Sequence, residues 1–568
     1  MKSVFKCIVA VVLVTACFNA ARQQKLRIIT WDNFGYYLHL PAVLKYHDCK
    51  NYAFADSLRS TYHASPSLYQ LTKTGDGRLT PTYTIGMAIC YLPGYFIGDL
   101  IARILGSPRD GMSPPYQWAL LLVALTMASA ALLLLYQVFS GYLRNSYRLL
   151  LLTGLMLGTN FLYYFVFETI TPHIVLFSLY TFLITATIRF RRKPTAVNAS
   201  GIILCATLLA LARPSEILSF VLPISYLTIA DPTYILRHRK IFLPGIAIAI
   251  LLVLLQIGLW WYTTGHFFFN PYPFHLELLK PHVFHGLFSF RKGWILYTPF
   301  FLLWFIGFLI PEKYWLKGWK LPVLLFSILQ IWIVFAWPMW WYASSFGMRA
   351  LIQCYPFFLL SVAAVFNFIE KQKNTWLSLL LLVFVIACIF LNLFQTYQYT
   401  KRILPLDGNT STYYKHVFFH TEFDRKALKY LDMDGDVPPL QLISKYQYND
   451  TMMELPHGVF STEKKIILPK SEKLWVVCEV EAAQESVHFG EYDFTKMVVE
   501  IKRGDSTLFW KSFHLQRLLN EKGSTVVVLP FHFENLVIGD QLKCYCWNNG
   551  PDTVHFRIKS ICISVPKD

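Results

Sequence analysis

The chain has 568 residues, of which 55% are hydrophobic and 15% charged, and its mean hydropathy is +0.40. A soluble protein of this length carries far more charge, so the composition excludes a soluble globular enzyme and indicates a membrane protein with many spans. The formal net charge of +18 could indicate nucleic-acid binding, but much of it lies in short loops between apolar segments, where membrane insertion and anionic lipids account for it. We therefore expect no nucleic-acid partner.

The first apolar run, at residues 8–21, follows two lysines. It is either a transmembrane helix or a signal peptide, and the Val-Thr-Ala-Cys stretch at 14–17 resembles a lipoprotein cleavage box. Because many spans follow, we favour an uncleaved helix. In both cases residue 22 onward emerges on the outer side.

Further apolar segments approach the roughly 20 residues that a membrane-crossing helix needs. They are 116–139, 149–167, 171–188, 198–212, 215–230, 241–262, 294–310, 321–338, 350–369 and 375–396. With the first helix they make about eleven spans, with the N-terminus inside and the C-terminus outside. The pair at 198–230 is short for two crossings, so we expect a tight hairpin with Arg213-Pro214 at its outer tip.

Every second loop between these segments is basic. The basic loops contain Arg144 and Arg148; Arg189, Arg191, Arg192 and Lys193; Arg237, Arg239 and Lys240; Lys313, Lys317 and Lys320; and Lys371 and Lys373. Since Lys and Arg are retained on the cytoplasmic side, the other loops face outward. Residues 82–101 are also apolar, but a crossing there would move every basic loop outside. We therefore expect an interfacial or re-entrant element within an outer loop at 22–115.

The C-terminal part has a different pattern. Residues 397–454 are polar and are predicted to be a solvated linker, with an acidic patch at Asp432, Asp434 and Asp436. From 455 to 568 the apolar residues alternate with a period of two, which is typical of strands. The candidate strands are KKIIL, KLWVVCEVEA, KMVVEIKR, STLFWKSFHL, STVVVLPFHF, QLKCYCW and VHFRIKSICISV, with a hairpin turn at 503–506. They predict an extracytoplasmic β-sandwich of jelly-roll type.

Four of the 11 cysteines lie in this predicted sandwich: Cys478, Cys544, Cys546 and Cys562. In an oxidising compartment one or two pairs could form disulfides, and the alternative is that they are small buried hydrophobic side chains. Cys544 and Cys546 point to the same side of one strand, so we do not expect them to pair with each other. No CxxC spacing supports a zinc site.

A carboxylate close to the end of the first helix is the main catalytic candidate. Asp32 lies in the segment WDNFGYYLHLP, near the predicted membrane boundary, and His47-Asp48 follows it. A carboxylate at this place could be the general base that activates an acceptor hydroxyl. The alternative is that Asp32 caps a helix that begins at Asn33, and residue type alone favours the cap.

Several cations lie at the predicted outer ends of helices, where the charge bias of membrane proteins disfavours them: Arg213, Arg291, Lys292 and Arg349. An arginine within a membrane helix costs about 2.5–3.5 kcal/mol, so an anionic partner such as a lipid-linked phosphate is expected. The alternative is that these side chains reach outer-leaflet headgroups. Glu168 and His173 lie in another outer segment without basic residues.

Together these segments resemble the GT-C superfamily of integral-membrane glycosyltransferases, in particular the protein O-mannosyltransferase and lipid A aminoarabinose transferase type. Asp32 matches the position of the family's catalytic acid, and RLTPTYTIG at 78–86 resembles its proline-and-glycine segment. Thr171-Pro172-His173, LFSFRKGWILYTP (287–299) and WWYASSFGMR (340–349) resemble further motifs of bacterial members. The likeness covers residues 1–396. Thr82 stands where many relatives have a second proline, and the second acid of the first loop is not obvious unless Asp48 takes its place.

The resemblance implies a GT-C-like transmembrane domain that transfers a sugar, with inversion, from a polyprenyl-phosphate-linked donor to an acceptor hydroxyl. The acceptor would be a lipid, a protein or a polysaccharide at the outer face of the cytoplasmic membrane. Asp32 would be the base, and the donor and substrate site would contain Arg78, Arg213, Arg291, Lys292, Arg349, Glu168, His173 and Asp48. No cofactor is required, and a divalent metal stays an open alternative. The sandwich resembles carbohydrate-binding modules in strand pattern only.

Two other functions stay open. A transporter or flippase for lipid-linked saccharides would also use outer cations, although it would be expected to contain inverted repeats, and the sequence has no internal repeat. A non-catalytic glycan-binding envelope protein would act through the sandwich alone. Substitution of Asp32 would then have no effect.

Overall fold

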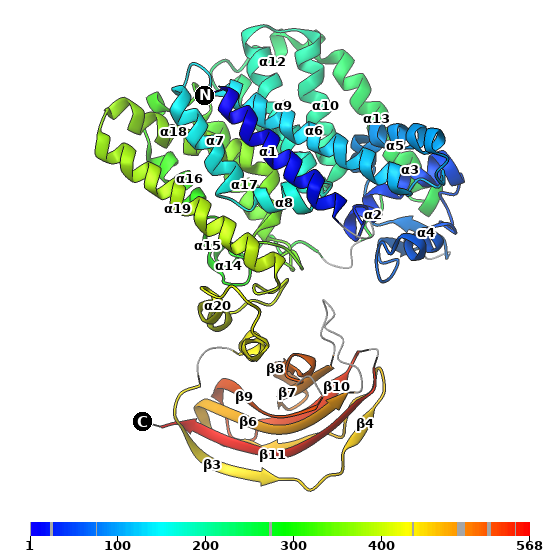
Figure 1. Cartoon of the computed structure of the whole chain (residues 1–568), viewed down its shortest axis with the longest axis vertical. Helices are drawn as coiled ribbons and strands as arrows, with labels where there is room; N and C mark the ends of the chain where they lie inside the picture. Colours follow the sequence, from blue (N-terminus) through cyan, green and yellow to red (C-terminus); the bar gives the residue numbers. More distant parts are fainter. Residues whose placement is uncertain are drawn as a thin grey trace. The chain divides into compact units, whose positions relative to one another are not determined.

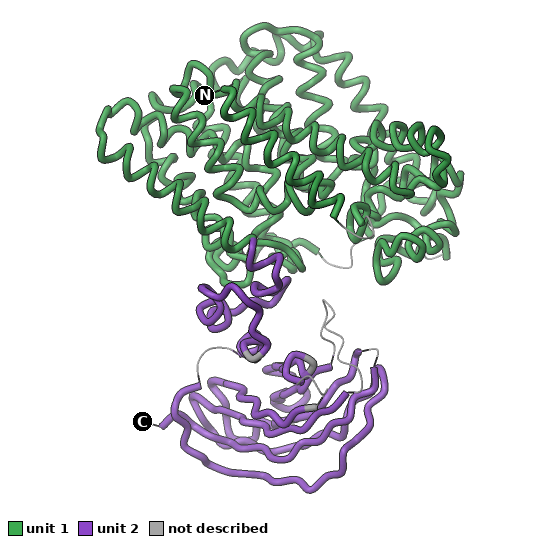
Figure 2. Tube along the Cα trace, in the orientation of Figure 1, with its two compact units in different colours: residues 1–396 green, residues 397–568 purple. Residues whose placement is uncertain are grey.

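The computed structural model describes residues 2–22, 27–74, 77–271, 275–433, 437–484, 495–519, 524–550 and 552–567. The chain divides into two compact units, Met1–Thr396 and Tyr397–Asp568 (Figure 2). Unit 1 is built mainly from helices, and unit 2 is built mainly from strands (Figure 1). The division lies where the sequence predicts the end of the apolar helices.

Unit 1 is a bundle of apolar helices, as expected for a membrane protein. Within the described residues, seven helices are long and apolar enough to cross a membrane. They are α1 (Lys2–Ala21), α5 (Gly86–Leu105), α6 (Pro114–Val138), α9 (Pro172–Arg192), the segment Arg239–Thr264 with α13 (Leu243–Thr264), the segment Arg349–Gln372 with α18 (Tyr355–Gln372), and α19 (Thr375–Thr400). This supports a membrane protein, whereas the predicted count of about eleven spans is not established.

The other expected spans are shorter or bent helices. The segment predicted at 149–167 is interrupted, because α7 (Asn145–Leu157) and α8 (Phe161–Phe167) meet at an angle of 63°. Shorter apolar helices occur at α10 (Ala196–Ala212), Pro299–Leu309 with α16 (Leu302–Leu309), and α17 (Lys320–Phe335). The segment predicted at 215–230 forms η2 (Pro214–Phe220) and α11 (Val221–Thr228).

The predicted basic loops lie together at one end of unit 1, which we call the basic end. Arg144 of the first basic loop forms an ion pair with Glu370, next to the last one, at 3.2 Å. Four other contacts join the remaining loops: the Tyr142 hydroxyl donates to Tyr314 O, the Tyr226 ring stacks on Trp319, Arg191 Nη1 donates to Leu227 O, and the Tyr234 ring packs on Phe190. The basic loops, which are every second loop along the sequence, therefore lie close together in the structure.

The segment that follows α1 lies at the opposite end, which we call the Asp32 end. Helices α1 and α6 run antiparallel, because the Phe5 ring stacks on Tyr136 at one end while Ile28 N donates to Gln117 Oε1 at the other. The buried face of α1 packs against α6, α7 and α8. Since α1 packs into the bundle, the structure supports a helix that is part of the fold.

Helix α5 contains the segment predicted to be interfacial. It is one continuous helix, and by length and composition alone it is among the candidate spans. A Cβ on Gly98 would lie 2.6 Å from Tyr116 Cα, so this glycine permits close packing of α5 on α6. Tyr83, just before α5, donates to Asp32, and Tyr62 donates to Asp110, just after it. Both ends of α5 thus contact the same segment at the Asp32 end.

Unit 2 contains two antiparallel sheets. One has the strand order β3-β11-β6-β9, with β4 also paired to β11, and the other has the order β5-β10-β7-β8. The strands are β3 (Leu440–Gln447), β4 (Met453–Leu455), β5 (Lys464–Ile467), β6 (Ser471–Gln484), β7 (Thr495–Arg503), β8 (Ser506–His514), β9 (Ser524–Leu536), β10 (Gln541–Asn548) and β11 (Val554–Pro566). Successive strands from β4 to β7 and from β8 to β11 alternate between the two sheets.

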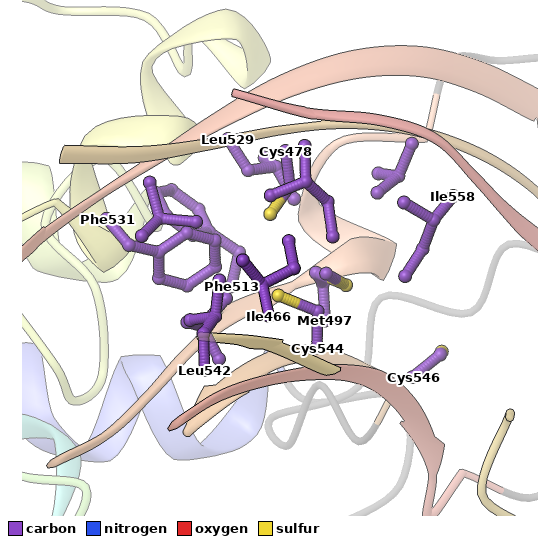
Figure 3. Close-up of a cluster of buried hydrophobic side chains, with 14 of the residues drawn as sticks. Ile466, Cys478, Met497, Phe513, Leu529, Phe531, Leu542, Cys544, Cys546 and Ile558 are labelled. Atoms are coloured by element: carbon purple, nitrogen blue, oxygen red, sulfur yellow. The ribbon is translucent and has the colours of Figure 1, made fainter. Parts of the chain in front are cut away.

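The two sheets enclose one apolar core, to which side chains of both contribute (Figure 3). The alternation of apolar residues along each strand explains this core, because every second side chain points inward. All seven predicted strands are confirmed as β5–β11, and Arg503 pairs with Ser506 across the predicted hairpin turn. The inward-facing apolar side chains of these strands form one common core.

The prediction of a solvated linker at 397–454 is wrong for much of that segment. It contains α20 (Ser411–Val417), η7 (Arg425–Asp432) and the two strands β3 and β4, which pair with β11. The side chain of Asp432 is 7% exposed, and its carboxylate lies 2.8 Å from Arg517 and 2.9 Å from His514. Of the predicted acidic patch, Asp434 and Asp436 lie outside the described residues.

The sandwich cysteines are small buried side chains in this structure. Cys478, Cys544 and Cys546 belong to the core, and Cys562 is half-buried. All four are free thiols. Cys544 and Cys546 do point to the same side of β10, as their spacing predicts.

Candidate functional site

Asp32 is the first residue of α2 (Asp32–Tyr37), at the Asp32 end of unit 1. The preceding residue, Trp31, takes the N-cap position with φ +52°, and no side chain caps the helix. The Asp32 carboxylate instead accepts hydrogen bonds on Oδ1 from the hydroxyls of Tyr69, at 2.9 Å, and Tyr83, at 2.8 Å. The interpretation of Asp32 as a helix cap is therefore wrong.

Arg349 lies on the other side of the Asp32 carboxylate. Its Nη2 is 3.6 Å from Asp32 Oδ2, and its side chain is 18% exposed, against 41% for Asp32. The structure thus joins two candidates that are more than 300 residues apart in the sequence. Tyr342 and Ala343, in the loop before Arg349, have φ +54° and +53°. A positive φ at bulky residues is uncommon and often accompanies functional sites.

The tyrosines that hold Asp32 flank a small hairpin. Tyr69 precedes β1 (Leu71–Lys73) and Tyr83 follows β2 (Leu79–Pro81), so the base of the hairpin carries both hydroxyls. Tyr83 is fixed further by its main chain, because His39 Nε2 donates to Tyr83 O at 2.8 Å. Its ring stacks on Tyr36 with centroids 4.1 Å apart.

The paired motifs expected at 287–299 and 340–349 lie against each other. Lys292 is buried, and its amine donates to Ser345 O. The Arg291 guanidinium lies 3.6 Å from the centroid of the Trp341 ring. A cation over an indole face is held in place, so both side chains connect the two segments. Lys292 thereby has a structural role between the motifs.

The outer segment with Glu168 joins the same cluster. Tyr164, in α8, accepts a hydrogen bond from Phe346 N at 3.0 Å, and Asn160 Nδ2 donates to Phe346 O at 3.1 Å. Glu168 accepts from the Tyr163 hydroxyl at 3.0 Å. Glu168 also lines a cavity of about 60 Å³ between the ends of α1 and α8.

A buried polar network continues from this cluster into the helix bundle. His173, the second residue of α9, donates from Nδ1 to Gln353 Oε1 at 2.8 Å. Gln353 Nε2 in turn donates to Glu216 Oε1 at 2.9 Å. Glu216 is fully buried and also accepts from Tyr180 and Gln330. The network thus ends at a buried carboxylate.

Arg213 stands between these two parts of the site. Its guanidinium lies 5.9 Å from the centroid of the Tyr342 ring, next to the strained loop. Arg213 and Arg349 are both close enough to His173 to interact with it electrostatically. The expectation that Arg213, Arg349 and His173 share one region is met.

Two predicted site residues lie elsewhere on the outer segment. Asp48 accepts hydrogen bonds from the main-chain N–H groups of Lys50, Asn51 and Ala53. Burial raises the pKa of Asp48, but these N–H groups outweigh it and hold the pKa below its ordinary value. Its carboxylate therefore has a local structural role. Arg78 lies at the turn side of the β1–β2 hairpin, whereas Asp32 contacts the base of that hairpin.

Three members of the site are not among the residues expected from the sequence: Tyr69, Tyr83 and Glu216. A signal for Glu216 was available, because an acidic residue within an apolar helical segment is a functional candidate. Tyr83 lies within the RLTPTYTIG segment, although nothing there marks its hydroxyl as a partner of Asp32, and Tyr69 carries no comparable signal. Among the residues that the structure describes, no group of three or more His, Cys, Asp or Glu side chains could hold a metal ion.

Comparison of the chain with family models, with curated proteins and with solved structures finds no match. The geometry of the site and the resemblance of its motifs are therefore the basis for a functional assignment.

Proposed function

We propose that the protein is a GT-C-type glycosyltransferase that moves a sugar from a polyprenyl-phosphate-linked donor to an acceptor hydroxyl. The observation that carries the proposal is the Asp32–Arg349 arrangement. A partly exposed carboxylate, held by Tyr69 and Tyr83, faces a mostly buried guanidinium at 3.6 Å. Such a pair can accept a proton on one side and bind an anion on the other.

In the proposed reaction Asp32 accepts the proton of the acceptor hydroxyl. The hydroxyl oxygen attacks the anomeric carbon of the donor, and the bond between this carbon and the phosphate oxygen breaks. The polyprenyl phosphate leaves with the electron pair of that bond, and the configuration of the anomeric carbon is inverted. The hydrogen bonds from Tyr69 and Tyr83 fix the carboxylate for this step.

Arg349 would stabilise the charge that develops on the leaving phosphate. In the ligand-free protein its guanidinium faces Asp32, and the donor phosphate would take over part of this contact. Arg291 and Arg213 supply further positive charge on the same loop region, through their contacts with Trp341 and Tyr342. His173 and Glu168 would line the substrate region, while Lys292 holds the two motifs together.

The proposal includes a membrane topology. The basic end would face the cytoplasm, so the Asp32 end and unit 2 would face outward from a cytoplasmic membrane. Helix α5 would lie in the outer interface, since both of its ends contact the segment after α1. The remaining helices would then supply about eleven spans. For unit 2, the alternation of strands between two sheets supports a jelly roll.

The test is a transfer assay with purified protein and a panel of radiolabelled polyprenyl-phosphate sugars and acceptors. Asp32→Asn keeps the shape of the side chain but removes its basicity, and we expect transfer to fall by at least about 100-fold. Asp56→Asn is the matched control, because Asp56 is an exposed carboxylate of the same outer segment that pairs only with the nearby Arg59 among its described contacts. This control should transfer at the wild-type rate.

Transfer by Asp32→Asn at the wild-type rate would remove Asp32 from the reaction. If the wild-type protein transferred no sugar from any donor of the panel, the proposal of a glycosyltransferase would be wrong.

A further inference from the structure

Unit 2 has a cavity of about 250 Å³ at the edge where β8 and β9 meet the end of η7. Its walls include Trp475 from β6, Trp510, Lys511 and Ser512 from β8, His532 from β9 and Asp432 from η7. The cavity is lined by residues of unit 2 alone, whereas Asp32 belongs to unit 1. Its volume is close to the lower end of the range for small-molecule pockets, about 300–1,000 Å³.

Rigid aromatic rings form two of its walls. The Trp475 ring stacks on the His532 ring, with centroids 4.9 Å apart and an interplanar angle of 27°. Trp510 is 45% exposed, and its indole nitrogen is oriented by a hydrogen bond of 3.3 Å to the Tyr545 hydroxyl. Trp510 thus offers a flat apolar face whose position is fixed before a ligand arrives, while Trp475, which is 7% exposed, forms a rigid wall behind it.

Polar groups of both signs stand beside these rings. Lys511 Nζ donates to His532 O at 2.6 Å, which places the ammonium at the cavity wall. Asp432 is fixed by Arg517 and by His514, whose main-chain N–H and ring both donate to its carboxylate. Burial raises the pKa of Asp432, but Arg517 and His514 outweigh it, so the pKa is lowered and the carboxylate is ionised at neutral pH.

Aromatic side chains continue from the cavity along the outer face of the sheet β5-β10-β7-β8. The Phe460 ring stacks on Trp547 with centroids 5.7 Å apart, and it lies 5.9 Å from Tyr545, the partner of Trp510. The Lys496 ammonium lies between the rings of Trp510 and Trp547, 5.7 and 5.6 Å from their centroids. Phe460 is 55% exposed. We call Phe460, Trp510, Tyr545 and Trp547 the aromatic row.

We propose that the cavity binds a sugar ring of a saccharide chain and that the next rings of the chain lie along the aromatic row. A sugar ring has apolar C–H faces that pack on aromatic rings, and hydroxyl groups around its edge that pair with both donors and acceptors. The cavity provides the rings of Trp475 and Trp510 together with Lys511 and Ser512.

A saccharide fits this face better than a protein or an acyl chain does. Lysines and acidic residues are depleted at the centres of protein–protein interfaces, whereas Lys496 and Glu500 lie among the aromatic side chains of this sheet. An acyl chain would cover the charged wall formed by Lys511 and Asp432 with apolar groups that cannot form hydrogen bonds, whereas the hydroxyl groups of a saccharide can. The inference does not depend on the proposed transferase.

The test is binding of the purified full-length protein to immobilised oligosaccharides, including neutral hexose, amino-sugar and uronic-acid chains, with no donor present. The expected result is retention of the wild-type protein on at least one of them. Trp510→Ala should weaken this binding about tenfold or more, because it removes the ring that joins the cavity to the aromatic row. Lys511→Met should also weaken it.

Leu508→Ala is the matched control. Leu508 is an exposed apolar residue of the same strand, 38% exposed, and it does not line the cavity. It should bind like the wild type. Thermal unfolding of each variant establishes that it is folded. The proposal is overturned if no saccharide is retained, or if folded Trp510→Ala and Lys511→Met bind as well as the wild type.

Discussion

His39 shows how a single buried residue supports the position of Asp32. Its Nε2 donates to the main-chain oxygen of Tyr83, while its Nδ1 is buried with no hydrogen-bond partner among the described residues. Burial lowers the pKa of His39 to about 4, although the bond to Tyr83 O opposes this shift. The ring is therefore neutral at pH 7, since a second proton would be buried without an acceptor.

This predicts a loss of stability in mild acid. The unfolded chain binds a proton at His39 near pH 6.5, whereas the folded chain binds it only near pH 4. The contribution of neutral His39 to the free energy of unfolding is therefore complete above pH 6.5 and is lost as the pH falls to about 4. The expected loss is about 3 kcal/mol. Thermal unfolding in detergent measures it, and His39→Gln, which keeps a donor for Tyr83 O, should lack this part of the pH dependence. An unchanged slope in His39→Gln would contradict the assignment.

At this scale the sequence identifies charges better than it identifies their partners. Asp32, Arg213 and Arg349 can be recognised in the sequence because a charged side chain near the end of a membrane helix is energetically costly and therefore indicates a functional role. Tyr69 and Tyr83 cannot be recognised as partners of Asp32, because tyrosine is common at membrane interfaces and a contact between distant residues leaves no local sequence pattern. The ion pair between Asp32 and Arg349 depends on the whole bundle, so the sequence could not predict it.

At the scale of elements, the fit between α2 and the segment before α5 sets the geometry of the site. Gly35 of α2 is the point of closest approach, since a Cβ there would lie 2.4 Å from the Tyr83 ring and 2.8 Å from Gln70 Cβ. Gln70 also holds the chain just before Asp32, because its Nε2 donates to Trp31 O at 3.1 Å. Because Gly35 has no side chain, Tyr83 and Gln70, which both help to position Asp32, can pack directly against α2.

Gly35→Ala should displace the Tyr83 ring and so disturb the hydrogen bond to Asp32. We expect transfer activity to fall by about tenfold or more while the bundle stays folded, because misplacement of a catalytic group by about 1 Å is costly. Gly258→Ala in α13 is the matched control, since a Cβ at Gly258 would meet no atom within 4 Å. Transfer rates and thermal unfolding of both variants measure the effect. Full activity of Gly35→Ala would show that the tyrosine contact is dispensable.

The elements themselves follow largely from periodicity. Strands β5–β11 bury one face, so their alternation is visible in the sequence. Strand β3 is mostly exposed on both faces and is held through its pairing with β11, so its sequence lacks that alternation and resembles a polar linker. The bend between α7 and α8 leaves no mark in the hydropathy pattern, because both helices are apolar.

At the scale of the whole molecule, the positions of α5 and of the basic loops make one joint prediction. If α5 lies in the interface, Asp56 and Lys317 are on opposite sides of the membrane, whereas a crossing by α5 would place them on the same side. Both residues are exposed in the structure. In intact cells a membrane-impermeant maleimide should label Asp56→Cys and not Lys317→Cys.

The background for this experiment replaces by serine the four cysteines that are not buried: Cys7, Cys17, Cys49 and Cys562. Permeabilised cells provide the control, in which both introduced cysteines should react. Labelling of both positions in intact cells would mean that α5 crosses the membrane. The assignment of the basic end to the cytoplasm would then be wrong.

The left-handed backbone at Trp31, Tyr342 and Ala343 has a consequence for protein engineering. A residue other than glycine costs about 1–2 kcal/mol in this conformation relative to the right-handed one. A glycine at position 343 would therefore relieve backbone strain in the loop that precedes Arg349. Selection for thermal resistance alone would favour such changes. They would also make the loop before Arg349 more flexible, so a variant selected in this way would be more stable to heat but would have a lower turnover rate.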